Sequence, residues 1–186
     1  KTKGKKIPVA IVFMAIFFFL APISLASENS FVNIVNPVRG KDFWGLKNQE
    51  PLTAVKEQLK LIQENNFKAT WLLRPDAIFD SQIVNYFKSF PPNQELGIFL
   101  EVTPSWTQRA QVGYHQGVLW HDAQSVFLSG YTFEERKKLI EIAFENFKNV
   151  FGHYPKSVGA WHLDAKSLEY MQRKYGVNSA LICADQ

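Results

Sequence analysis

The sequence contains almost no cysteine and has no excess of charge beyond its first few residues. Cys183 is the only cysteine among 186 residues, so no internal disulfide can form and stability must come from a hydrophobic core. The net charge of +4 arises from the first six residues, because 21 basic residues less the four lysines there leave 17, matching the 17 acidic ones. The sequence therefore predicts no nucleic-acid partner.

Motifs of several large enzyme classes are also missing. There is no phosphate-binding loop, no dinucleotide-binding glycine pattern and no nucleophile elbow around Ser129 and Gly130. With 46% hydrophobic and 15% aromatic residues, the composition instead suits one globular domain with a sizeable core.

Residues 1–26 have the pattern of an export segment. Lysines precede an apolar run at 8–21, and the small-residue stretch Ser24-Leu25-Ala26 resembles a cleavage site. We expect a signal peptide, with an uncleaved membrane anchor as the alternative, since 7–25 approaches the roughly 20 residues that span a bilayer. Either segment predicts a secreted or membrane-anchored, extracytoplasmic domain, and only the anchor makes the membrane a partner.

The rest of the chain alternates between strand and helix patterns. We predict five strands, at 31–37, 69–73, 95–104, 157–161 and 177–186, separated by helices at 51–66, 80–90, 132–151 and 165–175. Strict alternation indicates parallel strands with right-handed crossovers. An open five-stranded sheet and a barrel without its last strands both fit this order.

Local signals fix several of the predicted ends. Pro37 should end the first strand, since proline cannot donate to a ladder. Asp80 and Asp164 are expected helix caps, and Thr132 with Glu135 forms a capping box. Gly176 should end the last helix in a left-handed conformation. About 30 residues after the third strand are expected to form a long irregular loop.

The order of these pieces resembles the polysaccharide deacetylase (NodB-homology) family. The resemblance lies in NFKATWLL at 66–73, and in a helix followed by FG-x-x-P, a short strand, a helix and Tyr-Gly-Val at 138–177. It implies an α/β fold of the irregular (β/α)7-barrel type, covering 31–186 and truncated after the fifth strand. It also implies a carbohydrate-active hydrolase whose partner is a glycan or cell-surface polysaccharide.

The chain departs from that family at the expected metal ligands. The family's first strand usually ends in an Asp-Asp pair, whereas this chain has Val35-Asn36-Pro37. The positions of two further ligand histidines are occupied by Phe99 and Thr103. We therefore expect no bound metal and no cofactor. The resemblance supports the fold but not zinc-dependent deacetylation.

Three carboxylates are candidates for metal-independent catalysis. Glu101, Asp164 and Asp185 fall at or just after strand ends, where α/β proteins collect their active sites. Two such groups could serve as acid and base, or as acid and nucleophile, on a glycosidic bond. The structural alternatives are an ion pair of Glu101 with Arg74 or Arg39, and a helix cap for Asp164.

Further residues near the strand ends could bind substrate. Tryptophan faces suit the apolar faces of sugar rings, although core packing explains them equally well. The candidates are Asn36, Arg39, Arg74, Trp106, Trp120, Trp161 and His162. A metal-independent glycan hydrolase is the leading hypothesis. A non-catalytic glycan-binding module, and a deacetylase with a metal site rebuilt from His115, His121 and His162, are the alternatives.

Overall fold

The computed structural model describes residues 32–42, 51–119 and 121–182. The chain divides after Val32, and the fold below belongs to the second unit, Asn33–Gln186. The predicted export segment, Trp120, Cys183 and Asp185 lie outside the described residues. Within the described part, no helix combines the length and the apolar character needed to cross a membrane.

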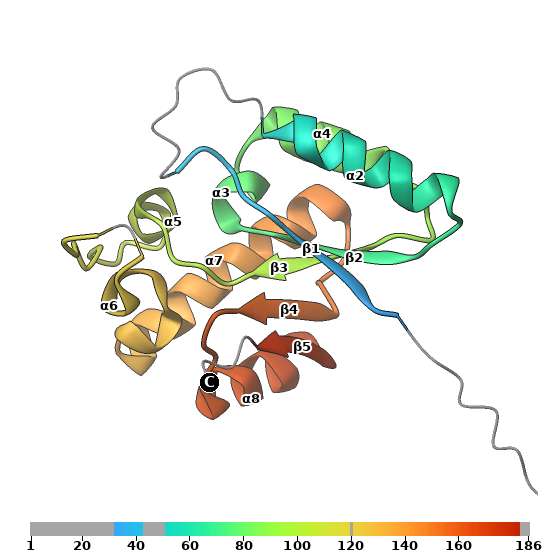
Figure 1. Ribbon diagram of the computed structural model, residues 1–186. Helices are drawn as coiled ribbons and strands as arrows, with labels where there is room; N and C mark the ends of the chain where they lie inside the picture. The colour runs from blue at the N-terminus through green and yellow to red at the C-terminus, as the bar shows by residue number, and fades with distance from the viewer. Residues whose placement is uncertain (1–31, 43–50, 120, 183–186) are drawn as a thin grey trace, which may run out of the picture. The chain divides into compact units, whose positions relative to one another are not determined.

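Five parallel strands form a sheet in sequence order, curved as a half-barrel (Figure 1). This confirms the predicted truncated barrel, and the strand order β1-β2-β3-β4-β5 is that of a chain wound in one direction. Because all strands are parallel, their carboxyl ends meet at one edge. The strands are β1 (Ile34–Val38), β2 (Ala69–Leu73), β3 (Glu95–Phe99), β4 (Ser157–Ala160) and β5 (Ser179–Ile182).

Four longer helices cover one face of the sheet, and their ends follow the local signals in the sequence. Asp80 accepts from the backbone of Gln82 and Ile83, and Thr132 forms the predicted capping box with Glu135. Gly176 ends the last helix with φ of 72°, a conformation that glycine adopts without strain. These helices are α2 (Leu52–Glu64), α4 (Ser81–Lys88), α7 (Phe133–Phe151) and α8 (Ala165–Tyr175).

Two expectations about the connections were wrong. β1 continues through Pro37, which pairs with Leu72, because β1 is an edge strand and proline needs a hydrogen-bonding neighbour on one side only. The long segment after β3 is also not an irregular loop. It contains α5 (Pro104–Arg109), α6 (Ala123–Val126) and a short 3-10 helix, Leu128–Gly130, while α3 (Pro75–Ile78) directly follows β2.

The two faces of the sheet are packed differently. Trp71, Ile98 and Val158 point toward the helices and are at most 1% exposed, within one continuous core. Burying a large apolar side chain of this kind contributes about 1.5–3 kcal/mol. On the other face Leu72 lies over Gly97 and Gly159, where a Cβ would come within 2.7 and 2.4 Å of its methyl carbons. The two glycines therefore make room for Leu72 and allow neighbouring strands to approach.

We predict that Gly97→Ala destabilises the fold by about 1–3 kcal/mol, the usual cost of overpacking. A Cβ at Gly97 would lie 2.5 Å from the carbonyl oxygen of Ser157, a backbone atom that cannot move aside without shifting β4. Urea unfolding checks this, with Gly113→Ala as the matched control, since nothing lies within 4 Å of a Cβ there. Equal stability of the two variants would contradict the packing described.

Candidate functional site

Charged and aromatic side chains from four strands converge at the carboxyl edge of the sheet. Arg39 directly follows β1, Arg74 follows β2 and Trp161 follows β4. Glu101 lies two residues beyond β3 and forms an antiparallel bridge with Phe127. Residues far apart in the sequence thus meet because parallel strands end at the same edge.

Glu101 is the centre of this cluster. It is completely buried, and its carboxylate accepts from three side chains. Arg39 donates to both oxygens, at 3.1 Å from Nε and 3.0 Å from Nη2, and Trp161 Nε1 donates to Oε2 at 2.6 Å. Arg74 Nη1 donates to Oε1. Both structural pairings that the sequence left open, with Arg39 and with Arg74, therefore occur together.

These contacts keep Glu101 ionised. Burial alone would raise the pKa of Glu101, but the hydrogen bonds from Arg39 and Trp161 and the positive charges of Arg74 and Arg39 outweigh burial. The pKa of the Glu101 carboxyl is therefore lowered from its ordinary value. A carboxyl group in this state has no proton to donate at neutral pH.

Arg74 connects Glu101 to a second buried carboxylate. The Arg74 side chain is 1% exposed, and its Nε and Nη2 each donate to Asp76 at 2.7 Å. Asp76 also accepts from the backbone N–H groups of Gly40 and Asp42, and Arg74 donates to the Asp42 carbonyl at 2.8 Å. The three guanidinium nitrogens of Arg74 thus all donate within the protein. Arg74 links the segment after β1 to Glu101.

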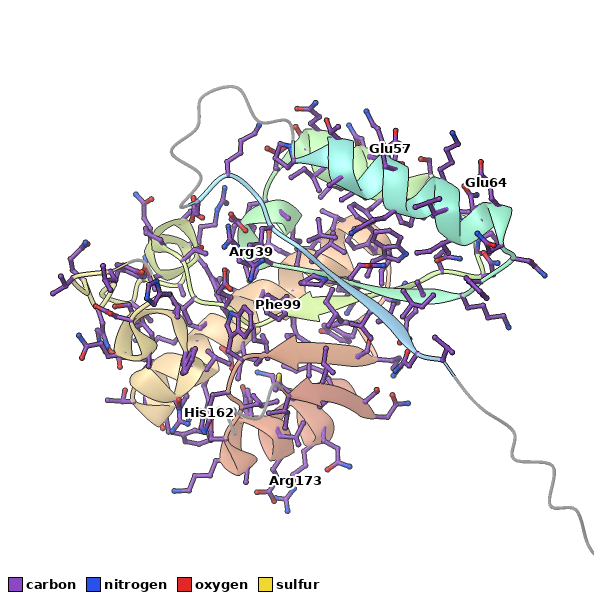
Figure 2. The ribbon with its side chains drawn as sticks, viewed as in Figure 1. Arg39, Glu57, Glu64, Phe99, His162 and Arg173 are labelled. Atoms are coloured by element: carbon purple, nitrogen blue, oxygen red, sulfur yellow. The ribbon has the colours of Figure 1, made fainter. Side chains whose placement is uncertain are left out.

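Trp161 and Arg39 form the exposed part of the cluster. Trp161 is 39% exposed, and its ring meets the edge of Phe99 at 5.8 Å between centroids. The Arg39 guanidinium lies 5.5 Å from the Phe99 ring and 5.7 Å from the Trp161 ring, and the labels in Figure 2 place Arg39 and Phe99 side by side. His162 is exposed next to Trp161 and stacks on Phe127 at 6.2 Å. The result is an aromatic surface with one fixed cation.

Asp164 belongs to a different set of contacts. Its carboxylate caps α8 by accepting from the backbone N–H of Ser167 at 3.0 Å, and it forms an ion pair with Arg136 at 2.5 Å. Burial raises the pKa of Asp164, but the contacts with Ser167 and Arg136 lower this pKa by more than burial raises it. The pKa of Asp164 therefore lies below its ordinary value. The cap predicted as the structural alternative is therefore present.

The remaining predicted binding residues lie in different surroundings. Trp106 is completely buried and donates from Nε1 to the Leu139 carbonyl at 2.9 Å, so it packs in the core, as the alternative held. Asn36 lies inside β1 rather than after it, and its side-chain nitrogen is buried without a hydrogen-bond partner. Trp120 and Asp185 lie outside the described residues.

Sequence reasoning missed Asp76 and Asp42 as members of the cluster. The tripeptide Arg74-Pro75-Asp76 was a usable signal, because proline at the first position of α3 turns the chain so that the charges of Arg74 and Asp76 face each other. Asp42 carried no such signal. Its carboxylate accepts from the backbone N–H of Ser105 and thereby connects the β1 segment to α5.

The described residues do not fit the metal that this fold implies. Among 32–42, 51–119 and 121–182, no group of three or more histidine, cysteine, aspartate or glutamate side chains could hold an ion. The Thr103 hydroxyl caps α5, and the Phe99 ring packs against Trp161. His115 stacks on Tyr131 and His162 on Phe127, so the rebuilt histidine site is not formed.

Comparisons with known proteins support the fold. No family model and no curated sequence matches the chain. A peptidoglycan N-acetylglucosamine deacetylase matches in structure with a TM-score of 0.51 and 13% identity, over 80% of this chain and 56% of that one. A family 4 carbohydrate esterase from Streptomyces lividans matches with 0.48 and 13%, over 81% and 62%. The chain thus spans less than two thirds of either protein. The first match confirms the predicted deacetylase-like fold.

We predict that Glu101→Gln destabilises the domain by about 3–5 kcal/mol at pH 7, since it leaves buried Arg74 without its second counter-charge. Because the pKa of Glu101 is lowered in the folded state, its ionised form stabilises the fold above the unfolded-state pKa of about 4.3. This stabilisation is lost as the pH falls through the folded-state pKa. The difference between wild type and variant should therefore shrink from pH 7 to pH 3. Urea titrations measure this difference in the free energy of unfolding. Glu57→Gln, exposed on α2, is the control because it removes the same charge.

Proposed function

We propose that this chain is an exported, glycan-binding domain with a deacetylase-like fold, and that it binds sugar rings on the surface formed by Trp161, Arg39 and His162. The observation that carries the proposal is the orientation of Trp161. Its indole N–H is fixed by Glu101, and the residue remains 39% exposed. Aromatic faces held rigidly at a surface suit the apolar face of a sugar ring.

The surroundings of Trp161 favour a neutral polar ligand. The side chain of Arg39 is 25% exposed and lies beside both aromatic rings, where its remaining N–H groups can donate to sugar hydroxyls. His162 extends the same surface on the connection from β4 to α8. The peptidoglycan N-acetylglucosamine deacetylase named above shares this fold, which supports a glycan as the ligand class.

The state of Glu101 favours binding over hydrolysis. A general acid needs a proton at working pH, whereas the pKa of Glu101 is lowered. A nucleophile needs a free oxygen, whereas Glu101 is completely buried and accepts from Arg39, Arg74 and Trp161. Glu101 is better explained as the group that orients Trp161.

A metal-independent glycan hydrolase is the second candidate. Its support is a carboxylate at the strand end that such folds use for chemistry, held between two arginines. Arg39 would have to release Glu101 for the carboxylate to reach a substrate. The two functions are separable, because only the hydrolase changes the glycan.

We predict that Trp161→Ala weakens binding to N-acetylglucosamine oligosaccharides and purified peptidoglycan at least about tenfold, or about 1.4 kcal/mol, since it removes the aromatic face. Trp161→Phe should have an intermediate affinity, because it keeps a ring for stacking but loses the N–H that Glu101 orients. Calorimetric titration measures both. Phe67→Ala is the matched control, because Phe67 is 51% exposed and precedes β2 at the opposite end of the strands. Unchanged binding by Trp161→Ala would refute the proposed surface.

The hydrolase is tested first on the wild-type chain. Incubation with the same glycans should release neither new reducing ends nor acetate above a heat-denatured control. Release that disappears in Glu101→Gln, under conditions where circular dichroism shows the variant folded, would establish the second candidate and overturn the non-catalytic proposal.

A further inference from the structure

A pocket lies at the opposite end of the sheet from Glu101. It has a volume of about 590 Å³, within the range of roughly 300–1,000 Å³ typical of small-molecule sites. Its walls are the C-terminal ends of α4 and α7 and the start of β3. Neither the glycan surface nor the Glu101 cluster contributes a residue to it.

The pocket opens where β3 and β4 are not yet paired. The ladder between them begins at Ile98 and Val158, whereas β2 already pairs with Glu95 at the start of β3. Leu96 therefore precedes the paired region and contributes to the wall. The opening follows from this sheet geometry, and the connections that precede β3 and β4 complete the wall.

The inner wall is apolar and rigid. Phe87 is 1% exposed and lies 4.3 Å from Phe90 between ring centroids, and Phe90 meets the edge of Trp71 at 5.3 Å. Val150 and Phe151 supply the facing wall from α7. Aromatic rings held in this way form a preformed apolar surface, which a flat ligand can cover at a small entropic cost.

The mouth of the pocket is positively charged. Lys88 and Lys156 contribute two cations, against the single carboxylate of Glu95. Lys156 Nζ also donates to the Gly176 carbonyl at 3.5 Å, which leaves two of its three N–H groups for a ligand. Glu95 already accepts from the Thr70 hydroxyl at 3.1 Å. His153 Nδ1 lies 3.0 Å from the Tyr154 carbonyl, which can only accept, so Nδ1 carries the proton and Nε2 is the ring nitrogen left for a ligand.

We propose that this pocket binds a small amphipathic monoanion, a flat apolar body of about two fused rings carrying one carboxylate. The apolar body covers Phe90 and Phe151, and the carboxylate pairs with Lys88 and Lys156. The cavity has room for such a ligand. The aromatic wall favours a flat apolar body over a sugar, and the excess of one positive charge favours an anion over a cation or a neutral polar molecule.

The test compares three probes that share one ring system: 2-naphthoate, 2-naphthylmethanol and 2-naphthylmethylamine. On the isotope-labelled full chain, naphthoate should shift the amide signals of Leu96, Phe151 and His153 and bind at least fivefold more tightly than the alcohol. The amine should not bind measurably. Shifts absent from these amides, or an alcohol that binds as tightly as naphthoate, would overturn the proposal.

Variants separate the charge from the pocket itself. The double variant Lys88→Gln, Lys156→Gln should reduce the preference for naphthoate over the alcohol at least threefold, with the alcohol affinity unchanged. Lys60→Gln, on the exposed side of α2, should leave the preference as in the wild type. Trp161→Ala should leave naphthoate binding intact, so the pocket and the glycan surface are tested independently of each other. A preference unaffected by the double variant would refute the assigned cations.

Discussion

The buried ion pair between Glu101 and Arg74 is the constraint on which the carboxyl edge of the sheet depends. Each of these side chains is 1% exposed, and an isolated buried charge is strongly unfavourable. Every remaining contact compensates for that burial: Asp76 balances Arg74, and Arg39 and Trp161 satisfy the second oxygen of Glu101. A single network therefore fixes the ends of four strands.

The contacts that hold Glu101 in place also restrict the changes in protonation and bonding that catalysis would need. A catalytic carboxylate must change its protonation state or its bonding during turnover, which requires partners that can leave. Around Glu101 the partners are two permanently charged arginines and an indole N–H. Arg39 also lies over the Phe99 ring, Arg74 pairs with Asp76, and the Trp161 ring packs against Phe99. The same contacts that make Glu101 a poor acid hold the Trp161 indole in the orientation that the proposed glycan surface requires.

The parts of the structure that depend on local sequence could be predicted, and those that depend on packing could not. Helix caps at Asp80, Thr132 and Gly176 rest on neighbouring backbone groups, so residue type and spacing were sufficient. The convergence of Glu101 with Arg39 and Arg74 followed from parallel topology alone. In contrast, the burial of Trp106 is set by its position against α7, and exposed and buried tryptophans look alike in a sequence.

The two ends of the sheet differ for one common reason. At the carboxyl end, β3 and β4 pair through Ile98 and Phe99, and the N–H of Leu100 continues the contact by donating to the Gly159 carbonyl at 2.6 Å. This pairing brings Glu101 and Trp161 together. At the amino end the same strands precede their paired region, so the helices above them cannot close over a continuous sheet and a pocket remains between α4 and α7. A ladder of only two residue pairs between β3 and β4 thus brings charged side chains together at one end of the sheet and leaves a pocket with aromatic and lysine side chains at the other.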